Sequence, residues 1–385
     1  AVNDVPATSN GTVLQAVYRN GPLSRAQLAE VTGLSKASIS NLTRGLLTES
    51  LLTEASAPRS GRGQGRPHVL LDVNPNHGWF AGVRIDEDSM RLALTDLKGA
   101  GERSLVVPIQ HEPQELAELI GQQLGALASR EKIPRARLLG LGIAVSGIVD
   151  HRTGICHHSA NLGWRDVPIG ELVRRATGLP TRVENDTNAV AIAQQMFGRA
   201  RDVTDFMVVT LGRGIGAAEF LDGRLYRGPD GGAGELGHCT VEPDGETCRC
   251  GKRGCLDTVA AEWAILDAAR RAGLAVATLP ELERLAATGS VPAMTILKRA
   301  GGALGLAISH LINIQSPQLV LVSGIDAELG AIMLSATRQA VENSILPRRL
   351  ASTIIEYHNF DENLWARGAA SIAAHHFLVN YGADD

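Results

Sequence analysis

Apolar positions near the start of the chain recur every three or four residues, the spacing of a helix with one buried face. Val13, Leu14 and Val17 predict a first helix over residues 12–19. The sequence Ser-Arg-Ala-Gln at residues 24–27 is a capping-box pattern, because the Ser side chain can accept from the third helical N–H while Gln reaches back. It predicts the start of a second helix, which a glycine ends.

A third helix is predicted to begin after Ser35 and to run through Leu47. Ile39, Leu42 and Leu46 fall on one face of it, which we expect to pack inward. The other positions are small, polar or basic: Lys36, Ala37, Ser40, Asn41 and Arg44. Two short helices, a tight turn and a third helix with a polar outer face are typical of a helix–turn–helix.

Two short runs after these helices predict a hairpin, residues 51–54 and 68–71. The segment between them is rich in Gly and Arg, so we interpret residues 57–68 as a wing or linker. Residues 1–74 are therefore predicted to form a winged helix–turn–helix domain.

From residue 75 onward, strand-like runs alternate with helical ones. The predicted strands are 79–85, 90–96, 138–149, 181–183, 206–211, a hairpin ending at 225, and 319–322. The predicted helices are 115–129, 169–177, 188–197, 260–272, 279–287, 291–314 and 366–379. This order predicts an α/β fold with two lobes, residues 75–188 with 366–385, and residues 189–365.

Composition supports a globular protein, with 44% hydrophobic and 20% charged residues among 385. The net charge is −4, but residues 1–68 hold seven Lys/Arg against four Asp/Glu, and the remainder holds 30 against 37. A basic head on an acidic body fits a DNA-contacting module. The polar first ten residues are unlike a secretory signal, and we expect a cytoplasmic protein without a membrane partner.

Three of the five cysteines fall within eight residues, inside a Gly-rich loop at 231–257. His238, Cys248, Cys250 and Cys255 make a set of one imidazole and three thiolates, which is typical of structural zinc. The alternative is a group of unrelated free cysteines. Cys156 and Cys239 lie outside the pattern, and we expect them to be packed thiols.

These motifs together resemble the ROK family of repressors and sugar kinases over nearly the whole chain. The resembling segments are the zinc loop, Glu-Asn-Asp-Thr-Asn-Ala at 184–189, Asn-Leu-Gly-Trp at 161–164, Ser-Gly at 146–147 and Gly-Arg-Pro at 65–67. The front helices resemble the repressor branch, since the family's kinases lack such a module. The resemblance implies a two-lobed, actin-like ATPase fold of the ROK sugar-kinase type behind the winged helix–turn–helix domain.

The resemblance also implies a pocket that binds a sugar. Its expected contacts are Asn161, Asn185, Asp186, Glu235, His238 and Asp257, the last standing where the family has Glu. Carboxylates and amides suit a ring of hydroxyl groups, and His238 could bind zinc with one ring nitrogen and a hydroxyl with the other. For Asp186 the alternative is a helix N-cap, and for Glu235 an ordinary surface acid.

The segment that cradles nucleotide phosphates in the family's kinases is altered. Those kinases carry Asp-x-Gly-Gly-Thr, and this chain has Arg84-Ile85-Asp86-Glu87-Asp88. Three carboxylates would repel a triphosphate, so no ATP binding is expected, and Asp186 would act only as a hydroxyl acceptor. The second phosphate loop keeps its glycines but carries Arg213.

We expect DNA to be read by the outer face of the third helix and by the wing. The predicted DNA contacts are Lys36, Ser40, Asn41, Arg44, Arg62 and Arg66. The alternative for the two wing arginines is a disordered basic linker.

The sequence thus predicts a sugar-responsive transcriptional regulator, a repressor without enzyme activity. Its expected partners are double-stranded operator DNA, a sugar or phosphosugar effector, and further copies of itself as a homodimer or higher homo-oligomer. Two alternatives remain: an active sugar kinase with an added DNA-binding head, and a regulator with a vestigial sugar site controlled by a protein partner.

Overall fold

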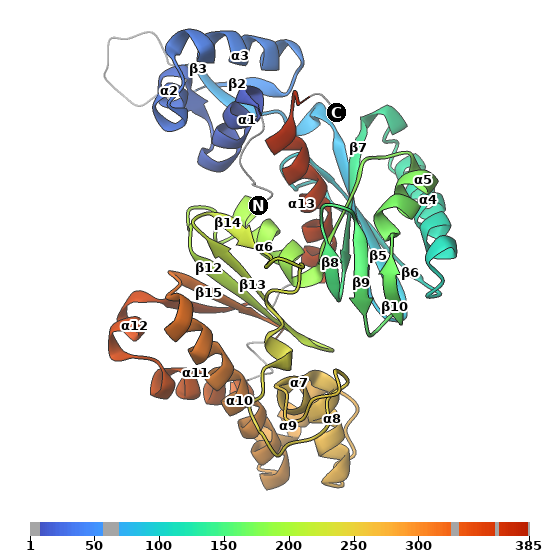
Figure 1. Ribbon diagram of the computed structural model, residues 1–385, viewed down its shortest axis with the longest axis vertical. Helices are drawn as coiled ribbons and strands as arrows, with labels where there is room; N and C mark the ends of the chain where they lie inside the picture. Colours follow the sequence, from blue (N-terminus) through green and yellow to red (C-terminus); the bar gives the residue numbers. More distant parts are fainter. Residues whose placement is uncertain (1–7, 57–68, 325–330, 359–361, 384–385) are drawn as a thin grey trace. The chain divides into compact units, whose positions relative to one another are not determined.

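The structure is a computed structural model, and it describes residues 8–56, 69–324, 331–358 and 362–383 (Figure 1). The chain divides into two compact units, residues 1–202 with 362–385, and residues 203–361. The predicted lobe boundary at residue 188 lies earlier than this division. The reason is that α6 (Asp186–Phe197) packs against α13 (Glu362–Asn380) and so clusters with the first unit.

The N-terminal part of the first unit has three helices and a small sheet. The helices are α1 (Ser9–Asn20), α2 (Arg25–Thr32) and α3 (Lys36–Thr48), which confirms the three predicted ones. The strands are β1 (Leu23–Ser24), β2 (Leu52–Ser56) and β3 (Val69–Val73), antiparallel in the order β1-β3-β2. The β2–β3 hairpin was predicted; β1 was not, because two residues show no periodicity.

Local hydrogen bonds explain where the head helices begin. At the start of α2, Ser24 Oγ accepts from the Gln27 N–H at 3.3 Å and Gln27 Oε1 accepts from the Ser24 N–H at 2.9 Å, which is the predicted capping box. Gly33 ends α2 in the left-handed conformation, with φ of 70°. Ser35 then caps α3 by accepting from the Ser38 N–H at 3.1 Å.

The main sheet of the first unit is five-stranded, in the order β11-β7-β4-β5-β6. Its strands are β4 (Trp79–Ile85), β5 (Ser89–Asp96), β6 (Arg103–Pro108), β7 (Leu138–Val145) and β11 (Thr181–Asn185). β4, β7 and β11 are parallel, while β4, β5 and β6 form an antiparallel meander.

Helices cover both faces of this sheet (Figure 1). Ala81, Val83 and Ile85 of β4 belong to the core that α4 (Pro113–Arg130) and α5 (Ile169–Thr177) share with the sheet. The intervening Gly82 faces α13 instead, as the twofold period of a strand requires. Both faces are therefore buried, which accounts for the nearly continuous apolar runs of these strands.

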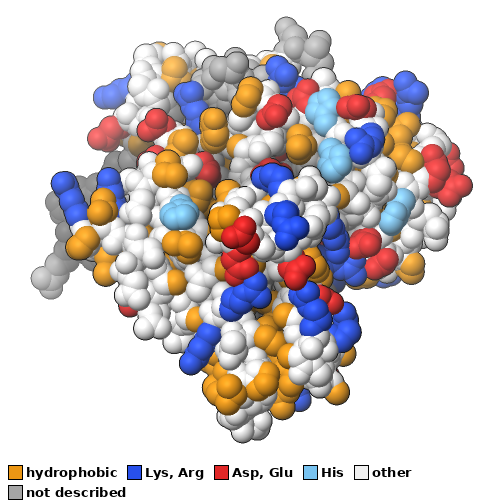
Figure 2. All heavy atoms as spheres, turned by 60° about the horizontal axis from the view of Figure 1, so that its bottom comes forward, with side chains coloured by type: hydrophobic (Ala, Val, Ile, Leu, Met, Phe, Trp, Pro, Cys, Tyr) orange, Lys and Arg blue, Asp and Glu red, His pale blue; other side chains and the backbone are white. Residues whose placement is uncertain are grey.

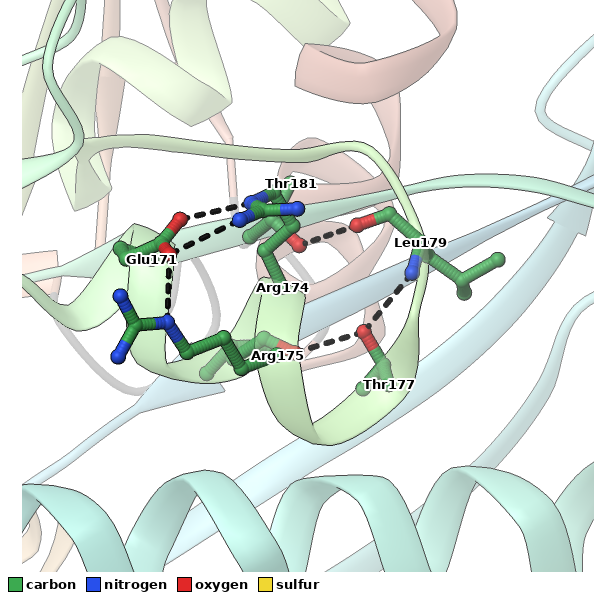
Figure 3. A network of polar contacts seen from close by, with 7 residues as sticks. Glu171, Arg174, Arg175, Thr177, Leu179 and Thr181 are labelled. Carbon is green, nitrogen blue, oxygen red and sulfur yellow. Dashed lines mark hydrogen bonds and ion pairs between the residues drawn. The ribbon is translucent and has the colours of Figure 1, made fainter.

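A short polar network leads from α5 into the strand that carries the candidate site (Figure 3). Thr177 Oγ1 donates to the Val173 carbonyl at 2.7 Å and accepts from the Leu179 N–H at 3.3 Å. Gly178 takes a left-handed φ of 67°, and β11 begins two residues after Leu179. On the outer surface, Glu171 pairs with Arg174 and Arg175, which lower the pKa of its carboxyl to about 2.

The prediction of one long strand over residues 138–149 was wrong. β7 ends at Val145, and the chain turns at Gly147, which has φ of 140° and leaves no room for a Cβ against the His158 carbonyl. A separate small antiparallel sheet follows, in the order β10-β9-β8. It consists of β8 (Ile148–Asp150), β9 (Ile155–Ser159) and β10 (Trp164–Val167).

The second unit has a five-stranded sheet in the order β14-β13-β12-β15-β16. Its strands are β12 (Phe206–Leu211), β13 (Ile215–Leu221), β14 (Arg224–Tyr226), β15 (Leu319–Ser323) and β16 (Ile354–His358). Its helices are α7 (Asp257–Ala260), α8 (Glu262–Arg271), α9 (Leu279–Ala287), α10 (Val291–Gln315), α11 (Ala331–Ser344) and α12 (Pro347–Ser352). The predicted helix over residues 260–272 corresponds to α8, and the sequence pattern did not predict β16, α7, α11 or α12.

α10 and α11 form the helical layer of the second unit, side by side in Figure 1. A Cβ at Gly301 or Gly305 would overlap backbone carbonyls of α11, so the two helices approach closely there. α10 is the one helix in the described part of the chain that is long and apolar enough to cross a membrane. Its Leu304 and Ile308 are, however, buried in the core of this unit.

One face of the molecule mixes charges of both signs. On the face that Figure 2 shows, basic and acidic side chains lie next to one another. Ion pairs of the second unit, such as Arg299 with Glu242 and Arg271 with Glu246, follow this pattern. Such exposed pairs contribute little to stability, so the cores described above carry most of it.

The packing of α13 on the sheet generates a stability prediction. A Cβ at Gly142 of β7 would overlap the Ala369 carbonyl of α13, so Gly142→Ala should lower the free energy of unfolding by about 1–3 kcal/mol. Gly125 on α4 is exposed with open space around it, and Gly125→Ala should raise that free energy by up to about 1 kcal/mol. Urea denaturation of both variants tests this, and equal effects would contradict the packing described.

Candidate ligand site, metal cluster and nucleic-acid interface

Asn185 and Asp186 lie where β11 ends and α6 begins. Asn185 pairs with Val145 of β7, so both residues stand at the carboxyl edge of the parallel strands, a common place for ligands in α/β sheets. The Asn185 side chain caps α6, because its Oδ1 accepts from the N–H groups of Thr187 at 2.9 Å and Asn188 at 3.3 Å. Its Nδ2 donates to the Gly147 carbonyl at 3.1 Å.

Asp186 is not the helix cap that the sequence left as an alternative, since Asn185 has that role. Asp186 is the first residue of α6, and its Oδ1 accepts from the Thr187 N–H at 2.9 Å. Burial raises the pKa of its carboxyl, while the positive charge of Arg84 opposes this effect and Asp86 adds to it. Because a carboxylate offers about four acceptor sites, Asp186 can accept hydrogen bonds from a ligand in addition to that from Thr187.

Glu184 holds this corner together, a role that sequence analysis missed. Its side chain is 1% exposed, and Oε1 accepts from the Asn185 N–H at 3.1 Å and from Asn188 Nδ2 at 3.0 Å. A buried acid needs such donors, so the Glu-Asn-Asp-Thr-Asn run works as one hydrogen-bonded corner. The available signal was the acid at the first position of the run, beside two asparagines.

Arg84 is the other charged group at this edge of the sheet. Its guanidinium pairs with Asp86 at 2.9 Å and lies over the ring of Trp365 at 4.2 Å. One of the three carboxylates expected to repel a triphosphate is therefore neutralised within the chain. The turn between β4 and β5 is held by the Asp88 carbonyl, which accepts a hydrogen bond from the Ile109 N–H at 3.1 Å.

Asn161 stands in the turn between β9 and β10 and is half-buried. Two residues before it, the backbone of Ser159 packs on Gly147. The carbonyl of Gly147 in turn accepts the hydrogen bond from the Asn185 side chain. Asn161, Asn185 and Asp186 thus belong to the first unit. The other three predicted sugar contacts, Glu235, His238 and Asp257, all belong to the second.

The four predicted metal ligands are brought together in the second unit. One ligand atom each from His238, Cys248, Cys250 and Cys255 lies within 4.8 Å of all the others. The distance from Cys250 Sγ to Cys255 Sγ is 3.6 Å, and that from Cys248 Sγ to His238 Nδ1 is also 3.6 Å. These four side chains form a cluster that could hold a metal ion.

The geometry and chemistry of the cluster fit a tetrahedral ion. Metal–sulfur bonds of about 2.3 Å at tetrahedral angles set sulfur atoms about 3.8 Å apart, close to the separation of Cys250 and Cys255. Burial and the two neighbouring thiols raise the pKa of Cys255 to about 12. A cation among the sulfur atoms would offset this by stabilising the thiolates.

Of the two cysteines outside the cluster, Cys156 is buried as expected, but Cys239 is exposed, so the prediction that it is packed was wrong.

The remaining predicted sugar contacts surround this cluster. His238 turns Nδ1 to Cys248, and its Nε2 lies 3.8 Å from the Glu235 carboxylate. Asp257, the first residue of α7, accepts from the Ile215 N–H with Oδ1 at 2.9 Å. Gly237 permits this arrangement, since a Cβ there would overlap Asp257. Two carboxylates and a ring nitrogen therefore gather beside the metal cluster.

The outer face of α3 carries most of the predicted DNA contacts. Lys36, Asn41 and Arg44 are exposed, whereas Ser40 is half-buried. On the inner face Ile39 and Leu46 are buried and Leu42 is half-buried, and Thr43, which was not predicted, is buried as well. Its hydroxyl accepts from Arg25 Nε at 3.1 Å and so joins α2 to α3. Arg62 and Arg66 lie outside the described residues.

Comparison with known proteins gives two family matches and several full-length relatives. Residues 80–376 match the ROK family, and residues 4–63 match the MarR family. A xylose repressor of Bacillus spizizenii is 28% identical over 95% of this chain and 94% of its own length. A putative xylose repressor of Caldicellulosiruptor is 31% identical over 86% of each chain, and the transcriptional repressor Mlc of Escherichia coli is 27% identical over 96% and 94%.

Solved structures agree with these matches. A ROK family transcriptional regulator described as a homologue of Mlc has a TM-score of 0.83, with 27% identity and 96% of both chains covered. A ROK family glucokinase from Streptomyces griseus has a TM-score of 0.67, covers 77% of this chain and 99% of its own, and is 24% identical. The second likeness shows the fold of the body alone, and the N-terminal module accounts for the difference in coverage.

Proposed function

The chain belongs to the ROK family, with a MarR-like winged helix domain in front, and from that membership we propose that it is a sugar-responsive transcriptional repressor. One observation carries the proposal: a single chain joins an exposed, basic and polar α3 face to a body with the ROK sugar motif. The relatives named repressors share both parts, since they match over nearly their whole length. Double-stranded operator DNA is the partner that such a helix face fits, and α3 would enter the major groove.

The proposed effector is a sugar or a phosphorylated sugar, held by side chains that accept hydrogen bonds from hydroxyl groups. Asn161, Asn185 and Asp186 provide acceptors in the first unit, and Glu235, His238 and Asp257 provide them in the second. A carboxylate can accept from two adjacent hydroxyls, which is why acids recur in sugar sites. In this role Asp186 binds a hydroxyl without removing its proton for a transfer reaction.

We propose that the body does not transfer phosphate. Arg84 stands where the family's kinases have their metal-binding Asp, and its pairing with Asp86 and stacking on Trp365 support a structural role. Asp86 and Glu87 stand where the family's kinases have glycines, so their side chains would obstruct a nucleotide's phosphates from approaching the backbone. A cationic side chain cannot hold Mg²⁺, so the metal required for phosphoryl transfer lacks its ligand.

Zinc is the proposed occupant of the metal cluster. His238, Cys248, Cys250 and Cys255 would hold it as a closed structural site and leave no open position for catalysis. A bound ion would fix the loop that carries Glu235 and Asp257, and would orient the His238 ring so that Nε2 points away from the cluster. The chain itself would act as a homodimer or higher homo-oligomer in the cytoplasm, reading an inverted-repeat operator.

Metal analysis tests the zinc assignment. Protein purified with reduced thiols should contain about one zinc per chain, and Cys255→Ser should lose the metal and unfold at a lower temperature, because metal binding is part of the folding free energy. Cys239→Ser is the matched control, since this thiol is exposed outside the cluster, and it should keep both metal and stability. Absence of stoichiometric zinc from the unsubstituted protein would refute the assignment.

Operator binding tests the proposed recognition face. After selection of an operator from random duplex DNA, Arg44→Ala should weaken binding by about 1–3 kcal/mol and relax specificity at one base pair, as loss of a bidentate base contact does. Lys36→Ala should weaken binding to all sequences and reduce the salt slope by about one. Arg103→Ala removes an equal charge from an exposed site on the body and should change neither. If Arg44→Ala left the sequence specificity unaltered, the proposal that this face of α3 reads the operator bases would be wrong.

Calorimetry tests the sugar site, with D-xylose, D-glucose and N-acetylglucosamine as probes, each free and phosphorylated. Asp186→Asn should weaken binding of the preferred sugar about 10- to 100-fold, the loss expected when a charged hydrogen-bond partner is removed. Because burial raises the pKa of Asp186, affinity of the unsubstituted protein should fall as the pH is lowered toward that pKa. The Asn variant should lose this pH dependence.

Two controls complete the sugar experiment. Asp166→Asn changes an exposed acid of the same unit, which pairs with His157, and should leave sugar affinity unaltered. The same samples with Mg-ATP should show no sugar phosphorylation, and turnover approaching about 1 per second would overturn the non-enzymatic proposal.

A further inference from the structure

Arg201 connects the body of the first unit to the DNA-binding head. Its Nε donates to the Arg19 carbonyl and its Nη2 to the Tyr18 carbonyl, both at 2.7 Å. These carbonyls belong to the last turn of α1, where no intrahelical N–H reaches them. A guanidinium at this end of a helix also meets the negative end of the helix dipole. Arg201 therefore holds α1 by its backbone.

An aromatic contact lies beside this pair of hydrogen bonds. The rings of Tyr18 and Phe197 meet edge to face with centroids 5.8 Å apart, and Tyr18 is only 8% exposed. Phe197 is the last residue of α6, and a Cβ at Gly99 in the β5–β6 turn would overlap its ring. The far end of α6 is thus packed against the head on one side and the sheet on the other.

The segment that carries Arg201 is fixed to α6. Gln194 of α6 accepts the Arg199 N–H with Oε1 at 3.0 Å, and its carbonyl accepts the Gly198 N–H at 3.0 Å and the Ala200 N–H at 3.2 Å. α6 itself is mostly buried, and a Cβ at Gly368 of α13 would lie 2.9 Å from one of its carbonyls. Residues 186–201 consequently form one stiff piece about 18 Å long in its helical part.

The two ends of this piece have different partners. Asn185 and Asp186 stand at its first turn, at the edge of the sheet where we place part of the sugar site. Arg201 and Phe197 stand at the other end, against α1 of the head. We propose that Arg201 positions the DNA-binding head, and that α6 makes this position depend on ligand contact at Asp186. The second half of the proposal rests on the proposed function.

A second connection keeps the head in place when Arg201 is removed. Tyr381, just beyond α13, donates from its hydroxyl to Glu49 Oε2 at the end of α3 at 2.6 Å, and its carbonyl accepts from Thr8 Oγ1 at 2.5 Å. Burial, together with Glu49, raises the pKa of Tyr381 to about 12, so this hydroxyl stays a donor at neutral pH. Substitution of Arg201 should therefore loosen the head without detaching or unfolding it.

Hydrogen exchange of the full-length protein tests the positioning role without any ligand. Arg201→Ala should speed amide exchange in the last turn of α1 roughly tenfold or more, because two of its carbonyl contacts to the body are lost. Arg201→Lys keeps the charge at the helix end but not the fork that reaches two carbonyls, and should give an intermediate rate. Arg175 is an exposed arginine of α5 that pairs with Glu171 (Figure 3), and Arg175→Ala should leave the exchange rates in α1 unchanged. Unchanged exchange in α1 of Arg201→Ala would overturn the positioning role.

Operator binding with and without the preferred sugar tests the regulatory half. If sugar changes the operator Kd of the unsubstituted protein by a typical allosteric factor of about 5 to 150, Arg201→Ala should reduce this factor to near one. Its sugar affinity in the absence of DNA should stay unchanged, because Arg201 does not contact the sugar site. A merely structural role would lower operator affinity but leave the factor intact, and that result would overturn the coupling.

The two tests separate this inference from the proposed function. If the unsubstituted protein bound neither operator DNA nor any sugar of the panel, the proposed function and the coupling through α6 would fail together. The exchange experiment would still decide whether Arg201 positions the head.

Discussion

The close approach of α13 to the parallel strands is the constraint on which the first unit depends. β4 and β7 carry glycines where the helix crosses, so the backbones of helix and sheet meet without side chains between them. That proximity lets one C-terminal helix contact the sheet, α6 and α1 together. Protein interiors tolerate little change in volume, so an added methyl group at the crossing would push α13 away from the sheet. The head, the sheet and the candidate ligand edge are therefore tied to a single element formed by the last residues of the chain.

The candidate sites are built by backbone hydrogen bonds as much as by side chains aimed at a ligand. The Asn185 amide caps α6 with its oxygen and donates to the Gly147 carbonyl with its nitrogen. The Glu184 carboxylate accepts from the Asn185 N–H and the Asn188 side chain. The result is a corner in which Asp186 is held rigidly with acceptor capacity left for a ligand. A similar arrangement occurs in the second unit, where the Asp257 carboxylate accepts a hydrogen bond from the Ile215 N–H beside the metal cluster. Rigid acceptors lose little entropy on binding, which favours recognition of a small polar molecule.

The charge distribution beside Asp186 supports the proposal that this body does not transfer phosphate. Arg84, which pairs with Asp86 and stacks on Trp365, places a positive charge near the Asp186 carboxyl. The likeness to a ROK glucokinase extends to the fold, and a shared fold does not by itself imply a shared activity. For a regulator it is enough that ligand binding changes the position of the DNA-binding head. In the first unit the stiff piece from Asp186 to Arg201 offers a physical route for this, with α1 as its end point.

The sequence alone determined the features whose causes are local. The capping box at Ser24, the glycine that ends α2, the helical period of α3 and the strand β4 all follow from neighbours within a few residues. The sequence also singled out the His/Cys set at 238–255 that the structure brings together as a possible metal site. Sequence periodicity did not find β1, β16, α11 or α12, because short or irregular segments gain their structure from partners distant in the chain. It also ran β7 through Gly147, whose turn is set by packing on His158 of another strand. Only the tertiary structure decided that Asn185 rather than Asp186 caps α6, that Arg84 pairs with Asp86, and that Arg201 binds α1, since each depends on which backbone groups the fold brings within hydrogen-bonding distance.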